Sequence, residues 1–266
     1  KVFRQIKSAP NPPDLCLMAG DYSENGTRAE LGAARDAFKL LGVPVFGVVG
    51  NHDFAANDER GAYDEIFPRQ LNYRFEQHGW QFLALDSTQG RRGSGTSIPA
   101  ATLQWLDDMV PKLDARRPTV LLTHFPLGAL TPARPLNADA LLERLKPLNL
   151  QAVFSGHFHG FTERRFADAV LTTNCCCSAW RANHDLSKEK GWFRCEARDG
   201  RITREDARRS RPALAGRAHA IRAGRQVELH AVRNQLRCPH RGDCQRHDVP
   251  RIPRDPALRS ARTERH

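Results

Sequence analysis

The chain lacks several features that would place it in particular protein classes. Its apolar runs are all shorter than a membrane-spanning helix, so we expect no membrane contact. Its seven cysteines include a consecutive triplet at 175–177, which suits no disulfide framework and indicates a reduced compartment. The chain opens without Met and without a charged-then-apolar leader, so we expect any export signal to lie upstream and favour a cytoplasmic location.

The last 60 residues lack Lys, Phe, Trp and Tyr altogether. Residues 207–266 hold 15 of the 41 basic residues and 5 of the 30 acidic ones, which leaves 26 basic and 25 acidic residues in 1–206. We therefore predict a near-neutral domain over 1–206 and an Arg-rich tail over 207–266. The tail cannot bury enough apolar surface to offset its ordering entropy, so we expect disorder.

The missing Lys suggests a further hypothesis, that the tail is GC-rich sequence translated out of frame. A nucleic-acid-binding function depends on the tail alone, and we consider a nucleic-acid partner unlikely. The sequence does not fix the oligomeric state.

The first 206 residues alternate strand and helix signals, which is typical of an α/β fold with parallel strands. Apolar residues at helical spacing and short buried runs mark the elements. We expect strands at 15–19, 45–49, 119–123 and 151–155, and helices at 31–41, 103–113 and 138–145. A hairpin is expected over 73–85, and an antiparallel run over 161–196.

Polar blocks follow four of these strands. They are Gly20-Asp21, Gly50-Asn51-His52-Asp53, Thr123-His124 and Gly156-His157-Phe158-His159. Functional side chains of open α/β sheets gather at the carboxyl ends of the strands. Carboxylate and amide oxygens beside imidazoles suit Mn, Fe, Zn or Mg ions, and a dinuclear hydrolase needs such a mixture.

Each block alone also has a structural interpretation. Asn51 could cap a helix, and His124 could be a buried core histidine. In an extended segment His157 and His159 would point to opposite faces, so both can bind metal only if a loop turns them. We expect Gly156 and Gly160 to permit that turn.

In this order the blocks resemble the calcineurin-like metallophosphoesterase family, over about residues 1–205. The match is nearest to its bacterial branch, which includes cyclic-nucleotide phosphodiesterases. The resemblance implies a four-layer α/β/β/α sandwich of two mixed sheets flanked by helices. It also implies a metal-dependent phosphoric ester hydrolase, in which a hydroxide bound at two divalent ions attacks a small phosphate ester.

The resemblance also implies roles for individual residues. Asp21 would bridge both metals, and His159 would bind the first. The second metal would be held by Asn51, His124 and His157. Asn51 and His52 would contact substrate, and His52 would assist the leaving group as the catalytic side chain. Purple acid phosphatases are disfavoured, because they carry Tyr where this chain has Glu24.

The chain departs from the family pattern at its start. The family opens with a strand ending in Asp-x-His, and nothing before Asp21 matches it. Residues 1–6 instead suggest a helix, so we expect an N-terminally truncated fold without its first strand. The first metal site would keep only Asp21 and His159 and be weak or empty. The alternatives are a cyclic-nucleotide phosphodiesterase specifically, or a catalytically impaired fragment that binds only metal or phosphate.

The cysteine triplet 175–177 allows two interpretations. It could lie beside the mouth of the site and help to bind substrate. Since buried cysteine usually behaves as a small hydrophobe, we favour packing at a strand end.

Overall fold

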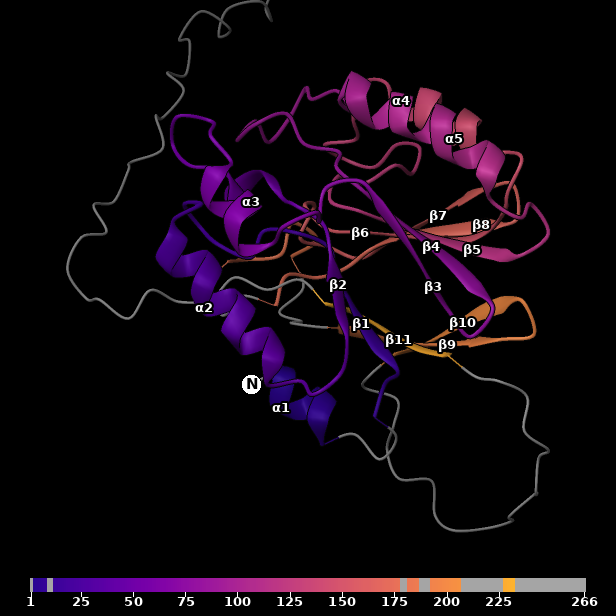
Figure 1. The fold of residues 1–266 in the computed structure, drawn as a ribbon, viewed down its shortest axis with the longest axis horizontal. Coiled ribbons are helices and arrows are strands. Elements are labelled where there is room, and N and C mark those ends of the chain that lie inside the picture. The colour runs from indigo at the N-terminus through magenta and orange to yellow at the C-terminus, as the bar shows by residue number, and fades with distance from the viewer. Residues whose placement is uncertain (1, 9–11, 178–180, 187–191, 207–226, 233–266) are drawn as a thin grey trace, which may run out of the picture.

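The computed structural model of the chain describes residues 2–8, 12–177, 181–186, 192–206 and 227–232 (Figure 1). Within these ranges no helix has both the length and the apolar character needed to cross a bilayer. The predicted tail lies largely outside the described residues.

Two β-sheets stack between outer layers of helices (Figure 1). The five-stranded sheet has the order β10 (Arg201–Asp206), β9 (Trp192–Arg198), β11 (Val227–Val232), β1 (Leu15–Met18), β2 (Val45–Gly47). The six-stranded sheet has the order β3 (Tyr73–Gln77), β4 (Trp80–Leu85), β5 (Pro118–Thr123), β6 (Asn149–Ser155), β8 (Ala169–Thr173), β7 (Thr162–Phe166). The helices are α1 (Val2–Lys7), α2 (Arg28–Lys39) and α3 (Gly61–Ile66) over the first sheet, and α4 (Ala100–Met109) and α5 (Ala138–Leu145) over the second. Two short 3₁₀ helices are η1 (Asn51–Asp53) and η2 (Val110–Lys112).

Alternation along the strands produces three apolar layers. Leu15 and Leu17 point from β1 toward the other sheet and form the central core with residues such as Val120. Their neighbours Cys16 and Met18 point the other way, onto α2 and α3. Strand residues alternate between faces, so sheets covered on both sides need continuous apolar runs. The predicted four-layer architecture is therefore confirmed.

Helix α2 shows how local sequence positions the site. Thr27 and Glu30 form a reciprocal capping box that starts the helix directly after the β1 loop. Leu31, Ala34 and Phe38 are buried against β1, as their spacing predicts. Gly42, with φ +73°, turns the chain back toward β2. The resulting β1–α2–β2 unit is parallel, so the carboxyl ends of β1 and β2 lie together.

The expected antiparallel run over 161–196 is divided between the two sheets. β7 and β8 pair in the six-stranded sheet, whereas β9 pairs with β10 in the other. The β9–β10 turn contains Asp199 (φ 50°) and Gly200 (φ 73°), the backbone of a two-residue hairpin loop. The Asp199-Gly200 pair is a sequence signal for a hairpin, but the expected run ended at residue 196 and did not include it.

Strand β11 differs from the expected disorder of 207–266. It lies between β1 and β9, parallel to β1 and antiparallel to β9. The sequence of residues 227–232 alternates apolar and polar residues, a pattern that fits a sheet strand but is too short to stand out in an Arg-rich segment. β1 therefore has a parallel neighbour on each side.

Replacing Ala231 with Pro tests this placement. β11 has a neighbour on both sides, so each N–H faces a partner strand, and proline removes one donor from the ladder. We expect the free energy of unfolding to fall by about 2 kcal/mol or more in urea titrations. The control Ala231→Ser keeps the N–H. Equal stability of the two variants would show that β11 is not part of the sheet.

Candidate metal centre

The four polar blocks converge at one edge of the sandwich. Asp21 and Asn51 follow β1 and β2 of the five-stranded sheet. His124 and His157 follow β5 and β6 of the six-stranded sheet. Parallel pairing within each sheet brings the carboxyl ends of these strands together. The two sheets thus each supply half of one cluster.

The side chains of Asp21, Asn51, His124 and His157, which we call the four-donor cluster, meet around His124 Nε2. His124 Nε2 lies 3.0 Å from Asn51 Oδ1, 3.3 Å from Asp21 Oδ1 and 3.3 Å from His157 Nδ1. His157 Nδ1 lies 3.1 Å from Asn51 Oδ1. Asp21 and His124 are fully buried, and Asn51 is nearly so.

The N–H groups of His124, His157 and Asn51 point away from the cluster. The Nδ1 of His124 donates to Ala19 O at 2.7 Å, and the Nε2 of His157 donates to Gly93 O at 2.7 Å. Burial lowers the pKa of His124 to about 4 and that of His157 to about 3, so each neutral ring has only that one N–H. Asn51 directs its Nδ2 to Arg91 O at 3.2 Å and its oxygen inward.

Four electron-pair donors therefore face one another with no imidazole or amide hydrogen between them. Such an arrangement is repulsive in a buried site unless a cation occupies its centre. Two imidazole nitrogens with an amide and a carboxylate oxygen fit Mn, Fe or Zn best among divalent ions. The residues present thus fit a bound divalent metal. Among the described residues, Asp21, His124 and His157 form the one group of ionisable ligands with donor atoms within 4.8 Å.

The loops that carry the cluster adopt unusual backbone conformations. Asp21, His157 and His159 have φ values of 56°, 58° and 52°, in the left-handed region that non-glycine residues rarely occupy. The expected turn between His157 and His159 is present, but the histidines themselves adopt it rather than Gly156 and Gly160. Each such residue costs of order 1 kcal/mol, a cost that clusters at functional sites.

Asp53 holds the first two loops in place. Its carboxylate accepts hydrogen bonds from Ser23 N at 2.9 Å, Ser23 Oγ at 3.2 Å and Gly50 N at 2.8 Å. Burial raises the pKa of Asp53 to about 7, although the hydrogen bonds from Ser23 and Gly50 act to lower it. The motif containing Asp53 was recognised in the sequence, but its bridging role requires knowledge of which loops meet.

His52 lies beside the cluster with one ring nitrogen already used. Its backbone N–H donates to Asp21 Oδ1 at 3.0 Å, and its Nδ1 lies 3.0 Å from Glu24 O. This contact occupies Nδ1 and not Nε2. Burial, followed by the nearby Arg181 and Arg91 charges, lowers its pKa.

His159 is brought near the site but does not join the four-donor cluster. It is buried, and its ring lies edge-on to His184 with centroids 5.6 Å apart. Burial and the charge of Arg181 lower its pKa to about 3. His159 is therefore a neutral imidazole outside the four-donor cluster.

Sequence reasoning missed the backbone groups that orient the cluster. The carbonyls of Ala19, Arg91 and Gly93 fix the proton positions of the ligands, as outer-shell hydrogen bonds do at metal sites. The segment 89–95 has no motif that would have revealed this. Its glycines and arginines were the only sign of a loop.

The described cysteines, including the triplet, are free thiols. Cys175 and Cys176 are buried, which favours the packing interpretation. Cys175 Sγ lies 3.8 Å from Asp185 Oδ2. Burial raises the pKa of Cys16 and of Cys195 to about 12, so neither acts as a nucleophile.

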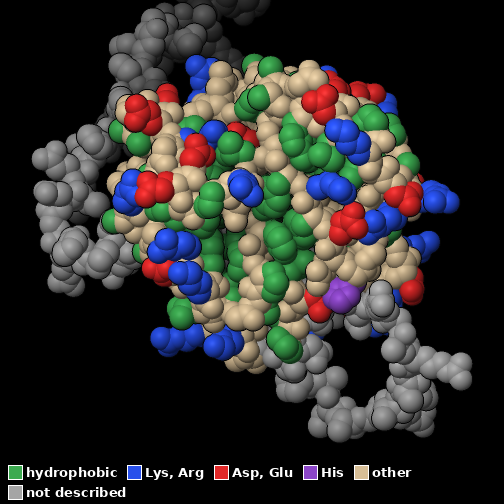
Figure 2. All heavy atoms as spheres, viewed as in Figure 1, with side chains coloured by type: hydrophobic (Ala, Val, Ile, Leu, Met, Phe, Trp, Pro, Cys, Tyr) green, Lys and Arg blue, Asp and Glu red, His purple; other side chains and the backbone are tan. Residues whose placement is uncertain are grey.

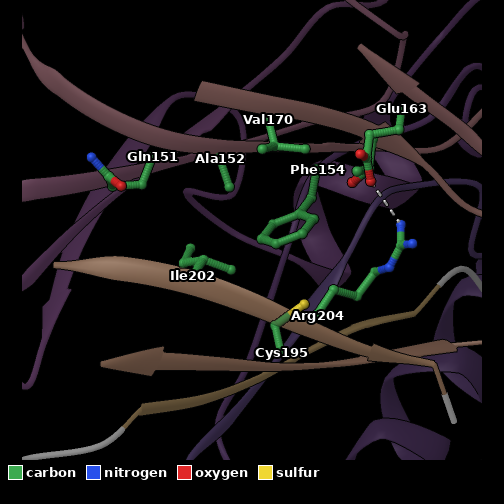
Figure 3. A pocket seen from close by; sticks show the side chains of 9 residues that line it. Gln151, Ala152, Phe154, Glu163, Val170, Cys195, Ile202 and Arg204 are labelled. Carbon is green, nitrogen blue, oxygen red and sulfur yellow. Dashed lines mark ion pairs between the residues drawn. The ribbon is translucent and has the colours of Figure 1, made fainter. Parts of the chain in front are cut away.

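A cavity of about 110 Å³ lies between the two sheets, away from this cluster (Figure 3). Phe154 and Cys195 line it, and an ion pair between Arg204 and Glu163, 3.4 Å apart, stands at one side (Figure 3). It can hold a few water molecules but not a drug-sized substrate. This cavity is therefore not a candidate substrate site.

Substituting Gly50 with Ala should damage the cluster specifically. A Cβ there would lie 2.2 Å from both the N and the Oδ1 of Asp21, so that carboxylate must shift. We expect Mn²⁺ affinity to fall about 10- to 100-fold in calorimetric titrations. The control is Gly32→Ala in α2, where a Cβ meets nothing within 4 Å. It should keep metal affinity and gain up to about 1 kcal/mol of stability. Unchanged affinity in both variants would contradict the proposed placement of Asp21.

Comparison with known proteins agrees with this geometry. The calcineurin-like phosphoesterase family model matches residues 1–161. The chain is 31% identical over 200 residues to a probable cyclic nucleotide phosphodiesterase of Synechococcus sp., covering 72% of this chain and 74% of that protein. It is 29% identical over 128 residues to a 3′,5′-cyclic-nucleotide phosphodiesterase of Nostoc sp., covering 47% and 46%.

A dimetal phosphatase structure from Danio rerio aligns over 60% of this chain and 71% of its own, at 17% identity and a TM-score of 0.45. The family match and the Synechococcus relative confirm the resemblance inferred from the four blocks. The chain therefore belongs to the calcineurin-like phosphoesterase family and is a metallophosphoesterase, a hydrolase that acts on phosphoric ester bonds.

Proposed function

We propose that the four-donor cluster holds one divalent cation and that ester hydrolysis takes place beside it. The observation that carries this proposal is the convergence of Asn51 Oδ1, His124 Nε2, His157 Nδ1 and Asp21 Oδ1 without an intervening proton. A bound cation would lower the pKa of a water molecule and withdraw charge from a phosphoryl oxygen.

The surrounding residues would orient the substrate. The Nδ1–H of His52 donates to Glu24 O, which fixes the ring. In the protonated ring, Nε2–H would donate to a phosphoryl or leaving-group oxygen. The pairing of Asn51 Nδ2 with Arg91 O keeps the amide oxygen toward the cation. The burial of Asp21 and His124 excludes bulk water and strengthens electrostatic interactions at the reacting phosphate.

A second cation would have an incomplete site in this chain. Asp21 can share its carboxylate, and His159 can supply one imidazole, but the described residues place no third ionisable ligand with these two. We propose that any second metal binds weakly. This also keeps open the alternative that the chain binds metal or phosphate and is impaired in turnover.

A small phosphate ester is the proposed substrate class. The Synechococcus and Nostoc relatives are named cyclic-nucleotide phosphodiesterases, which makes cyclic nucleotides a second, narrower candidate. On the face in Figure 2, acidic and basic side chains are interspersed, with no continuous basic surface. That face gives no support to a nucleic-acid partner.

Metal removal and replacement test the cation proposal. Chelator-treated protein should lose hydrolysis of bis(para-nitrophenyl) phosphate and recover it on adding Mn²⁺. Elemental analysis after desalting should find about one ion per chain, because the described residues supply one complete donor set. Two tightly retained ions per chain would contradict the incomplete second site. Full activity without metal would refute the proposal.

His52→Ala tests the catalytic side chain. We expect kcat to fall at least about a hundredfold with metal content unchanged, because the backbone N–H of His52 that donates to Asp21 is kept in the variant. His78→Ala is the matched control, since His78 lies in the β3–β4 turn and pairs with Asp14 at 3.7 Å. Wild-type turnover in His52→Ala would show that another group performs this step.

A further inference from the structure

We propose that Arg181 determines substrate specificity at the mouth of the metal centre. It would exchange its ion pair with Glu24 for a second negative charge on the substrate, so that the site favours dianionic phosphate groups. This inference rests on the proposed function, because it assumes that substrate phosphate binds beside the four-donor cluster.

Arg181 belongs to a short segment, 181–186, that is fastened to the site. His184 N donates to His159 O at 3.0 Å, and Phe161 N donates to Asp185 Oδ2 at 3.1 Å. Asn183 is buried, and its Oδ1 accepts from Cys176 N at 3.0 Å. The segment is thus tied to the loop that carries His159 and to the cysteine triplet. Arg181 therefore starts from a fixed base.

From this base the guanidinium reaches the opposite wall of the site. Arg181 Nη2 pairs with Glu24 Oε1, on the loop between β1 and α2. The carbonyl of the same residue, Glu24 O, lies 3.0 Å from His52 Nδ1. Arg181 lies in the segment that follows β8, and this segment is bonded to the loop after β6. The ion pair consequently joins this segment to the loop that carries Asp21. An approaching ester would pass this bridge.

The contacts of Arg181 place it between loops of the two sheets. Its segment is bonded to the His159 loop through His184 N, and its partner Glu24 contacts His52 through its carbonyl. A phosphate group beside the cluster would lie in the field of this guanidinium.

The pairing with Glu24 is easily exchanged. The side chains of Arg181 and Glu24 are 34% and 43% exposed. An ion pair with this much exposure to water contributes little to the stability of the fold. A guanidinium can instead form two parallel hydrogen bonds to phosphate oxygens. Arg91 cannot substitute for it, because its two Nη atoms donate to the carbonyls of Phe54 and Glu24.

Charge balance indicates which esters benefit. The single negative charge of a phosphodiester would be met by the cation. A phosphomonoester, or inorganic phosphate, brings a second charge that needs a further partner, and Arg181 is placed to provide it. Glu24 competes for the same guanidinium, so loss of its charge should strengthen binding of dianions.

The test compares Arg181→Met with Arg116→Met in Mn²⁺-loaded protein. Arg116 precedes β5, at the end remote from His124, and its side chain is 92% exposed. For Arg181→Met we expect KM for para-nitrophenyl phosphate to rise about tenfold, and KM for bis(para-nitrophenyl) phosphate less than about threefold. Inorganic phosphate in alkaline buffer should bind about tenfold more weakly by calorimetry. Arg116→Met should resemble the wild type in each measurement.

Glu24→Gln should act in the opposite direction and tighten phosphate binding. Equal changes in KM for the two esters, or unchanged phosphate affinity in Arg181→Met, would overturn the inference. If the wild type hydrolyses neither ester, the proposed function fails. The phosphate titrations then still decide whether Arg181 binds a dianion.

Discussion

Four electron-pair donors from two different sheets meet in a buried site, and their mutual repulsion is the constraint around which the site is organised. Each imidazole N–H donates a hydrogen bond to a backbone carbonyl. The other ring nitrogens, His124 Nε2 and His157 Nδ1, face Asn51 Oδ1. A cation would convert this repulsion into attraction. The left-handed backbone of Asp21 and His157 and the close approach of Gly50 to Asp21 are consequences of bringing these atoms together.

The stacked sheets make that convergence possible. Parallel strands β1 and β2 end beside each other, as do β5 and β6, and the shared apolar core holds one pair of ends against the other. Asp53 then joins the loops after β1 and β2 through Ser23 and Gly50. Strand β11 supports β1 from its other side, so the carboxyl end that carries Asp21 belongs to a central strand. The core thus supplies rigidity, and the loops supply chemistry.

Local patterns in the sequence predicted the α/β fold and the polar blocks, and the resemblance to the family implied the layered sandwich and the roles of the cluster residues. Apolar runs ending in Asp21, Asn51, His124 and His157 are visible without knowledge of contacts. What could not be predicted depends on which distant segments meet. The pairing of Arg181 with Glu24, the Gly93 carbonyl on His157 and the position of β11 all join residues far apart in sequence. The left-handed histidines were missed because glycine is the usual residue for that conformation.

X-ray absorption spectroscopy of the protein loaded with one equivalent of Zn²⁺ tests the central claim most directly. The geometry predicts a first shell with two imidazole nitrogens, from His124 and His157, and oxygen donors for the remaining positions. His124→Ala should reduce the imidazole contribution to one, whereas His159→Ala should leave it at two. A shell with three or more imidazoles, or one unaffected by His124→Ala, would contradict the proposed cluster.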